Sequence, residues 1–277
     1  DYTVVGNTVT ILKAYLANQS VGTTNLMFTF SGGATQTLEI TVSDTTPVPT
    51  PTPGPGSGPT PTSTPTPTPT PTPKPFYIDA VNIDVIKAMV AQLNTSPVVS
   101  FKDVPASAPN AKAIGLATKL GIIKGYDDGS FRAHATITRA EFASMLVRAL
   151  GLTSEGDSDF KDTKVHWAAD AIATLETKGI IKGYLDGTFK PDQTITRAEI
   201  VSMLSKAMNT TFVNNNKFQD VIGHWAETEI DALSAMGIVK GAPDGSFKPN
   251  VNATRYESLL MILRMLNASL DHSLDIE

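Results

Sequence analysis

The chain contains no cysteine among its 277 residues. Disulfide scaffolds, thiol catalysis and cysteine-ligated zinc or iron–sulfur sites are therefore excluded. It also lacks any apolar run close to the ~18 residues that a membrane-spanning helix needs, so we expect no membrane insertion. The net charge is −5, and lysine and arginine form no run or stripe. We therefore expect no nucleic-acid partner.

Recognisable catalytic and metal-binding motifs are missing as well. The sequence contains neither G-x-S-x-G nor H-E-x-x-H, the motifs of serine hydrolases and zinc proteases. Asp128, Asp186 and Asp244 each precede a glycine, but the ligand spacing of an EF-hand is not met, so we interpret them as turn residues. We expect no catalytic site, no metal site and no cofactor within these residues.

Proline is scarce except in one segment, because most of the 19 prolines lie between Pro47 and Pro75. Proline fixes φ and removes the amide donor, so neither a helix nor a sheet can form across this Thr-Pro tract. We predict a semi-rigid polyproline II linker over residues 46–75. A spacer role is favoured over a recognition motif for proline-binding domains.

Residues 1–45 are rich in β-branched and aromatic residues with the period of two that is typical of half-buried strands. We expect strands over residues 3–5, 8–11, 26–30 and 37–42. The segment resembles the C-terminal half of the immunoglobulin-like accessory modules found beside bacterial glycoside hydrolases and in cellulosome scaffolds. The resemblance implies a β-sandwich fragment. Since the chain opens inside the first expected strand, we expect an upstream cargo domain in the same chain.

Beyond the linker the sequence repeats itself at an interval of 58 residues. The landmarks of the second copy are F-x-D, H-W-A, G-I-I-K-G-Y, D-G-T-F-K-P and I-T-R-A-E, in this order within Phe160–Glu199. We place a leading amphipathic helix within residues 76–98, and the three repeats at 99–152, 158–210 and 216–277. Each repeat is expected to hold two helices, the second of which begins at the threonine of T-R-A-E.

These repeats resemble S-layer homology domains. The resemblance implies a mainly α fold in which three repeats form a pseudo-threefold helical unit, preceded here by the linker and the immunoglobulin-like fragment. It further implies non-covalent anchoring of an exported protein to the bacterial cell wall. The ligand would be a secondary cell-wall polysaccharide, often with a pyruvylated sugar, bound in grooves between repeats on the surface of Gram-positive and related bacteria. Two alternatives stay open: the tail of a surface carbohydrate-active enzyme, and a structural S-layer array component.

The arginine of T-R-A-E is a principal ligand-binding residue in that family, which points to Arg139, Arg197 and Arg255. A capping box accounts for Thr196 and Glu199. It does not account for Arg197, because a cation is mildly unfavourable at a helix N-terminus. Exposed amides beside a guanidinium would suit a carboxylate. The alternative is an internal salt bridge, for which Asp162 and Asp220 are the candidate partners.

Trp167 and Trp225 offer indole faces that could stack on a sugar ring, or anchor a helix on the core, and the residues do not decide between the two. In the first repeat, Pro109 stands at the tryptophan position. From the family's grooves we expect each arginine to meet the F-x-D and H-W-A elements of the next repeat. That pairing joins Arg139 with Asp162 and Trp167, Arg197 with Asp220 and Trp225, and Arg255 with Asp103 and Pro109. It makes the groove of Arg255 the weakest.

Overall fold

The computed structural model describes residues 2–5, 8–11, 22–29 and 35–42, and residues 75–276 apart from 94, 97–99, 155, 211–214 and 272–273. The chain divides into two units, Asp1–Pro69 and Thr70–Glu277. Nearly all of the predicted linker lies outside the described residues.

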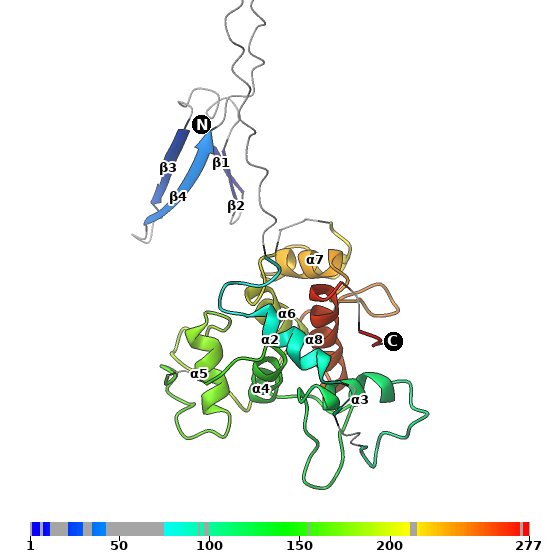
Figure 1. Cartoon of the computed structure of the whole chain (residues 1–277). Helices are drawn as coiled ribbons and strands as arrows, with labels where there is room; N and C mark the ends of the chain where they lie inside the picture. The colour runs from blue at the N-terminus through cyan, green and yellow to red at the C-terminus, as the bar shows by residue number, and fades with distance from the viewer. Residues whose placement is uncertain are drawn as a thin grey trace, which may run out of the picture. The chain divides into compact units, whose positions relative to one another are not determined.

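The described residues of the first unit form two antiparallel strand pairs (Figure 1). Strand β1 (Tyr2–Val5) pairs with β2 (Thr8–Ile11), and β3 (Gly22–Thr29) pairs with β4 (Thr35–Val42). Leu26 lies opposite Leu38 in the second pair. These strands confirm the four expected from the sequence, except that Phe30 lies outside the described residues.

The second unit is helical over its described residues, which contain isolated bridges but no strand. The mainly α fold is thus confirmed. Its helices are α2 (Ile83–Ala91), α3 (Ala111–Lys119), α4 (Arg139–Ala149), α5 (Ala169–Thr177), α6 (Arg197–Lys206), α7 (Glu227–Ala235) and α8 (Arg255–Ser269), with a short 3-10 turn η1 at Gln219–Val221. In this described part, no helix is long and apolar enough to cross a membrane.

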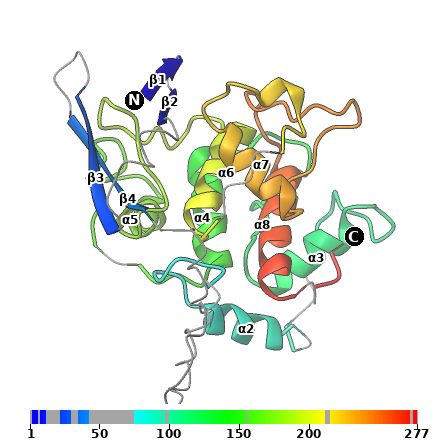
Figure 2. The ribbon, with the colours of Figure 1, turned by 90° about the horizontal axis from the view of Figure 1, so that it is seen from above.

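The second helices of the three repeats meet around a pseudo-threefold axis. Just before these helices, three residues form a closed ring of backbone hydrogen bonds: Ile195 N donates to Ile137 O, Ile137 N to Ala253 O, and Ala253 N to Ile195 O. Helices α4, α6 and α8 lie at the centre of the unit, with α3, α5 and α7 around them (Figure 2). The expected threefold arrangement therefore closes, with the third repeat bonded to the first.

Each outer helix packs on the inner helix of another repeat. Helix α5 packs on α4, α7 on α6, and α3 on α8. The first helix of a repeat therefore covers the second helix of the preceding repeat, and the first repeat covers the third. The start of each outer helix therefore lies beside the inner helix of a different repeat.

A packed pair of phenylalanines joins the loops of each repeat. Phe160 packs against the fully buried Phe189 with a ring separation of 5.5 Å. The equivalent pairs in the other repeats are Phe101–Phe131 and Phe218–Phe247. Gly183 passes so close that an added Cβ would lie 2.2 Å from the Phe160 ring. The glycine that ends each G-I-I-K-G motif is thus required by packing.

The leading helix is shorter than predicted, because α2 begins only after its cap, Asn82. The preceding residues are held extended against the end of α6: Tyr77 pairs with Met208, and Ile78 N donates to Ala207 O. The Tyr77 hydroxyl donates to Ser269 Oγ of α8 at 3.0 Å. This segment belongs to the core of the helical unit, since Tyr77 and Ile86 are almost fully buried.

Candidate functional site

The helices that carry the T-R-A-E motifs begin with complete capping boxes. Thr196 Oγ1 accepts from the Glu199 amide, and the Glu199 carboxylate accepts from the Thr196 amide. The first two helical amides are also occupied, because Arg197 N donates to Val251 O and Ala198 N to Pro249 O of the next repeat. The expectation that exposed amides help to bind a carboxylate is therefore wrong, because these amides already donate hydrogen bonds to the next repeat.

The three arginines bind the ring of repeats together. Arg139 is 3% exposed, and its Nε donates to Phe189 O at 2.8 Å while its Nη1 lies 2.7 Å from Glu199 Oε1. Arg197 does the same with Phe247 and Glu257, and Arg255 with Phe131 and Glu141. The salt bridge considered for these arginines thus exists, but its partner is the T-R-A-E glutamate of the next repeat rather than Asp162 or Asp220.

The two aspartates hold a loop of their own repeat. Asp162 accepts from the amides of Phe189 and Lys190 at 2.9 and 2.8 Å. Asp220 accepts from those of Phe247 and Lys248 at 2.9 and 2.7 Å. Burial raises the pKa of Asp220, but these amide bonds outweigh burial and hold it below the usual value. Each aspartate fixes the phenylalanine whose carbonyl receives the arginine Nε.

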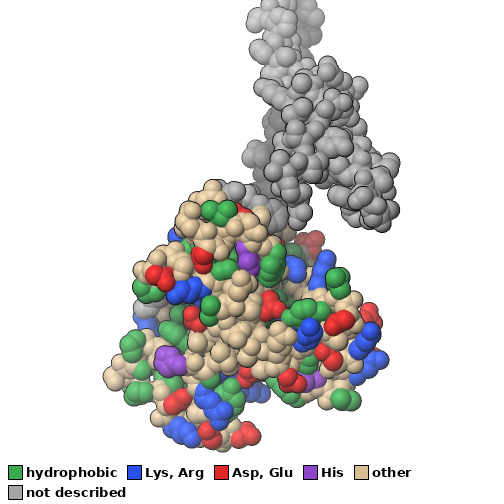
Figure 3. All heavy atoms as spheres, turned by 180° about the vertical axis from the view of Figure 1, so that it is seen from behind, with side chains coloured by type: hydrophobic (Ala, Val, Ile, Leu, Met, Phe, Trp, Pro, Cys, Tyr) green, Lys and Arg blue, Asp and Glu red, His purple; other side chains and the backbone are tan. Residues whose placement is uncertain are grey.

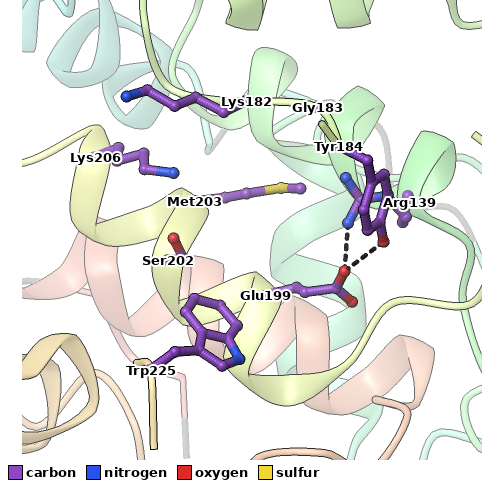
Figure 4. Close-up of a pocket in the computed structure, with 9 residues that line it drawn as sticks. All are labelled: Arg139, Lys182, Gly183, Tyr184, Glu199, Ser202, Met203, Lys206 and Trp225. Atoms are coloured by element: carbon purple, nitrogen blue, oxygen red, sulfur yellow. Dashed lines mark hydrogen bonds and ion pairs between the residues drawn. The ribbon is translucent and has the colours of Figure 1, made fainter. Parts of the chain in front are cut away.

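A cavity of about 250 Å³ lies beside Arg139, and we call it the α6 groove. Its lining comprises Arg139, Lys182, Gly183, Tyr184, Glu199, Ser202, Met203, Lys206 and Trp225 (Figure 4). Glu199 Oε1 accepts from both Arg139 and the Tyr184 hydroxyl. Figure 4 shows Trp225 alongside α6, next to Glu199 and Ser202, with the two lysines beyond Met203. The lining thus joins residues of all three repeats.

Positive charge is concentrated in this groove, where three cations face a single carboxylate. The pKa of Lys206 lies below its usual value because the residue is half-buried and because Lys182 and Arg139 carry the same charge. Trp225 is 60% exposed. An apolar ring face beside a cluster of like charges suits a ligand that combines an anionic group with an apolar surface.

A related cavity of about 250 Å³ lies between α4 and α5, and we call it the α4 groove. It is lined by Ser144 and Arg148 of α4 and by Trp167 at the start of α5. Burial and the charge of Arg255 lower the pKa of Arg148. The hydroxyl of Tyr126 donates to Glu141, which also pairs with Arg255. Ser144, Arg148 and Trp167 thus repeat Ser202, Lys206 and Trp225 of the α6 groove, whereas Tyr126, Glu141 and Arg255 do not line this cavity.

The third cavity, the α8 groove, is larger, at about 370 Å³. Its lining includes Arg197, Lys240, Glu257, Arg264 and the apolar residues Ala242, Leu260 and Met261. No tryptophan is among the lining residues. Pro109 stands at the tryptophan position before α3, the helix that packs on α8.

Comparison with known proteins gives the repeats a family. Residues 100–143, 159–201 and 217–257 match the S-layer homology domain. The chain carries three S-layer homology domains. Residues 1–40 match carbohydrate binding domain X2, in line with the accessory module expected at the N-terminus.

Relatives share these domains over part of their length. Cell surface glycoprotein 1 of Acetivibrio thermocellus is 42% identical over 52% of this chain and 7% of that protein. The cellulosome-anchoring protein of the same organism is 38% identical over 60% of the chain and 38% of its own length. S-layer protein EA1 of Bacillus anthracis is 34% identical over 63% and 21%. The chain therefore spans only a minor part of each of these relatives.

The S-layer homology domains pair their arginines and tryptophans differently from our expectation. Arg139 of the first domain shares a groove with Trp225 of the third rather than with Trp167. The outer helix that bears the tryptophan crosses to the preceding domain, so the α6 groove draws on three domains, whereas the α4 and α8 grooves draw on two each. The groove without tryptophan is consequently that of Arg197, not that of Arg255.

Both tryptophans lie at the surface, with Trp167 64% and Trp225 60% exposed. The neighbouring histidines fix the starts of the outer helices, since His166 Nδ1 accepts from Ala168 N and His224 Nδ1 from Ala226 N. The start of each outer helix is thus fixed by histidine, whose ring lies 5.3 Å from the neighbouring indole, while both indoles stay largely exposed.

Sequence reasoning missed the tyrosine and the second basic residue of each groove. Tyr126 and Tyr184 recur at the 58-residue interval, as do Arg148, Lys206 and Arg264. That recurrence was the available signal. It carried no meaning until the fold brought both positions beside the T-R-A-E glutamate.

Proposed function

We propose that the S-layer homology domains anchor an exported protein to the cell wall by binding an acidic secondary cell-wall polysaccharide in the inter-domain grooves. The observation that carries the proposal is the α6 groove, in which an exposed Trp225 lies beside Arg139, Lys182 and Lys206. A pyruvylated sugar supplies a carboxylate for the cations and an apolar ring face for the indole. Lys206 would be the main charged contact, and the buried Arg139 would contribute its positive charge from the wall of the groove.

The domain content indicates a secreted protein associated with the cell wall. The name of the cellulosome-anchoring relative supports an anchoring role for this chain, with an upstream domain as cargo. Within that role we assign residues 46–75 to a spacer, residues 76–98 to the lead-in that packs on the helical core, and residues 99–152, 158–210 and 216–277 to the three domains. The N-terminal segment would belong to the carbohydrate-binding part of the longer protein.

The mixed surface charge is compatible with a localised groove site. On the face shown in Figure 3, acidic and basic side chains alternate without forming a large patch of one sign. Anion binding would therefore depend on the grooves rather than on the surface as a whole.

Co-sedimentation with cell-wall sacculi tests the proposal. We expect the full chain to sediment with native sacculi, and not with sacculi from which the wall polymer has been extracted or the pyruvyl ketals removed by mild acid. Equal sedimentation with extracted sacculi would contradict polysaccharide binding. Sedimentation that survives removal of the ketals, yet is lost with the polymer, would contradict the pyruvylated sugar alone. Self-assembly without walls would favour the structural-array alternative.

A further inference from the structure

The three grooves differ at the residues that surround the T-R-A-E glutamate. In the first and second repeats, a tyrosine hydroxyl donates to that glutamate beside the arginine. In the α8 groove the tyrosine position holds Ala242. The side chain of Glu257 is accordingly 43% exposed, against 20% for Glu141 and 18% for Glu199. The cavity is also larger, about 370 Å³ against about 250 Å³.

Two further ligand-facing groups are missing from the α8 groove. Ser144 and Ser202 line the α4 and α6 grooves, whereas the equivalent position on α8 is Leu260. The exposed tryptophan is replaced by Pro109. The groove has thus lost its stacking surface, its hydroxyl and its tyrosine, while it keeps Arg264 and Lys240.

The C-terminal segment lines a second cavity, which shares Lys240 and Arg264 with the α8 groove. Leu274 and Ile276 are 6% and 8% exposed, and Leu274 N donates to Asn267 Oδ1 of α8 at 2.7 Å. Asp275 pairs with Lys112 of α3. A cavity of about 320 Å³ is lined by Asp275, Ile276, Lys240 and Arg264 together, so the segment borders the two cations of the α8 groove.

We propose that only the α4 and α6 grooves bind the wall sugar, and that Lys240 and Arg264 of the α8 groove serve instead as an internal contact for residues 274–276. This inference rests on the proposed function. Asp275 places a carboxylate of the chain itself beside Lys240 and Arg264, which disfavours a second carboxylate there. An incoming sugar would find neither an indole to stack on nor a hydroxyl to bind. Wall binding is then bivalent rather than trivalent, and losing either competent groove removes the avidity of the pair.

Site-resolved titration of the full chain tests the inference. The probe is a methyl hexopyranoside that carries a 4,6-linked pyruvyl ketal. Because Trp167 and Trp225 are the only two tryptophans, their indole N–H signals report the α4 and α6 grooves separately. The Leu274 amide reports the C-terminal segment, which borders Lys240 and Arg264 of the α8 groove. We expect both indole signals to shift with the probe and the Leu274 signal to stay in place, with a calorimetric stoichiometry of two.

Matched variants assign the sites. Arg148→Gln and Lys206→Gln remove the equivalent cation from the two competent grooves, and Arg264→Gln removes it from the third. Each of the first two is expected to lower the stoichiometry from two to one, while Arg264→Gln leaves it at two. A stoichiometry of three, a shifted Leu274 amide, or a site lost with Arg264→Gln would overturn the inference alone. No response at either indole would refute the proposed function and this inference with it.

Discussion

Arg139 and Trp225 line one cavity although a complete repeat separates them in the sequence. Arg139 begins α4 in the first repeat, and Trp225 precedes α7 in the third. The second repeat supplies the floor between them, with Glu199 and Lys206 on α6. Ligand binding in this groove would therefore depend on the closed ring, and its residues divide into those that hold the ring and those that face the ligand.

Trp225→Ala is expected to weaken wall binding while leaving stability unchanged. The indole is 60% exposed, so its removal creates no core cavity. A lost aromatic platform is worth about 0.5–1.5 kcal/mol beyond area, or a roughly two- to twelvefold weaker groove. Sedimentation with sacculi and thermal melting measure the two effects. His224→Ala is the control, because it should lower the melting temperature through the Ala226 amide; a large thermal shift in Trp225→Ala would instead assign the indole to the core.

Arg139→Ala is expected to destabilise the helical unit, because it leaves a partly buried Glu199 without its cation and opens the contact between two repeats. Breaking a buried ion pair by removing one partner costs about 3–5 kcal/mol. Urea unfolding measures this loss. Arg132→Ala is the matched control, since Arg132 pairs with Asp128 at the surface with half of its side chain exposed. Equal unfolding midpoints for the two variants would show that Arg139 does not hold the ring.

The local part of this architecture follows from the sequence. A threonine three residues before a glutamate determines a capping box wherever it starts a helix, so Thr138, Thr196 and Thr254 were correctly placed. The repeats and their two helices follow from the recurring motifs and the apolar stripes. Each of these features depends on residues within a few turns of one another.

The arrangement of the grooves does not follow in the same way. The partners of Arg139 and Arg255 lie 60 and 114 residues away, and either an aspartate or a glutamate would have satisfied the charge. The path of the outer helix decides which tryptophan meets which arginine, and that path depends on packing rather than on any motif. Our prediction paired each arginine with the tryptophan position of the next repeat. It therefore placed the groove without tryptophan at Arg255, whereas the structure places it at Arg197.

Ile86→Ala in α2 is expected to destabilise the helical unit although α2 lies outside the repeats. Ile86 is 1% exposed and packs in the same core as the three domains. Truncating a buried isoleucine costs about 2–5 kcal/mol. Thermal melting followed by circular dichroism measures the shift. The neighbouring Val85→Ala, at a position 39% exposed, is the control and should change the melting temperature much less. If both variants have the melting temperature of the wild-type chain, α2 does not belong to the core.

Asp220→Asn is expected to lower stability near neutral pH and to lose this effect in acid. Asp220 accepts two amides beside Lys248, whose φ of 61° is left-handed. Since these bonds hold its pKa below the unfolded value of about 3.9, the stabilisation is complete above that value and disappears as the pH falls through the folded pKa. We expect a melting temperature about 2–4 °C lower at pH 7, the shift that a 1 kcal/mol loss gives in a unit of this size.

The same measurement at a pH below the lowered pKa of Asp220 should bring the two melting temperatures together. Asp127→Asn changes an exposed aspartate of the first repeat and serves as the control. A difference between Asp220→Asn and the wild-type chain that persists unchanged into acid would mean that the carboxylate charge is not what holds the loop.

Wall binding by the α6 groove is expected to weaken at alkaline pH, and Lys206 is the reason. Its pKa is lowered by burial and by Lys182 and Arg139, and a bound carboxylate would favour its charged form. Affinity is therefore complete below this lowered pKa and falls as the pH rises through it, by the ~1.5–3 kcal/mol of a charge-assisted hydrogen bond. Burial raises the pKa of Tyr184, so the phenol stays protonated over the same range. In the Arg148→Gln variant the α4 groove no longer binds the probe, so probe binding reports the α6 groove alone. Adding Lys206→Arg to this variant should move the alkaline midpoint of probe binding upward, because arginine keeps its charge. An unchanged midpoint would assign the titration to another group and remove Lys206 from the ligand contacts.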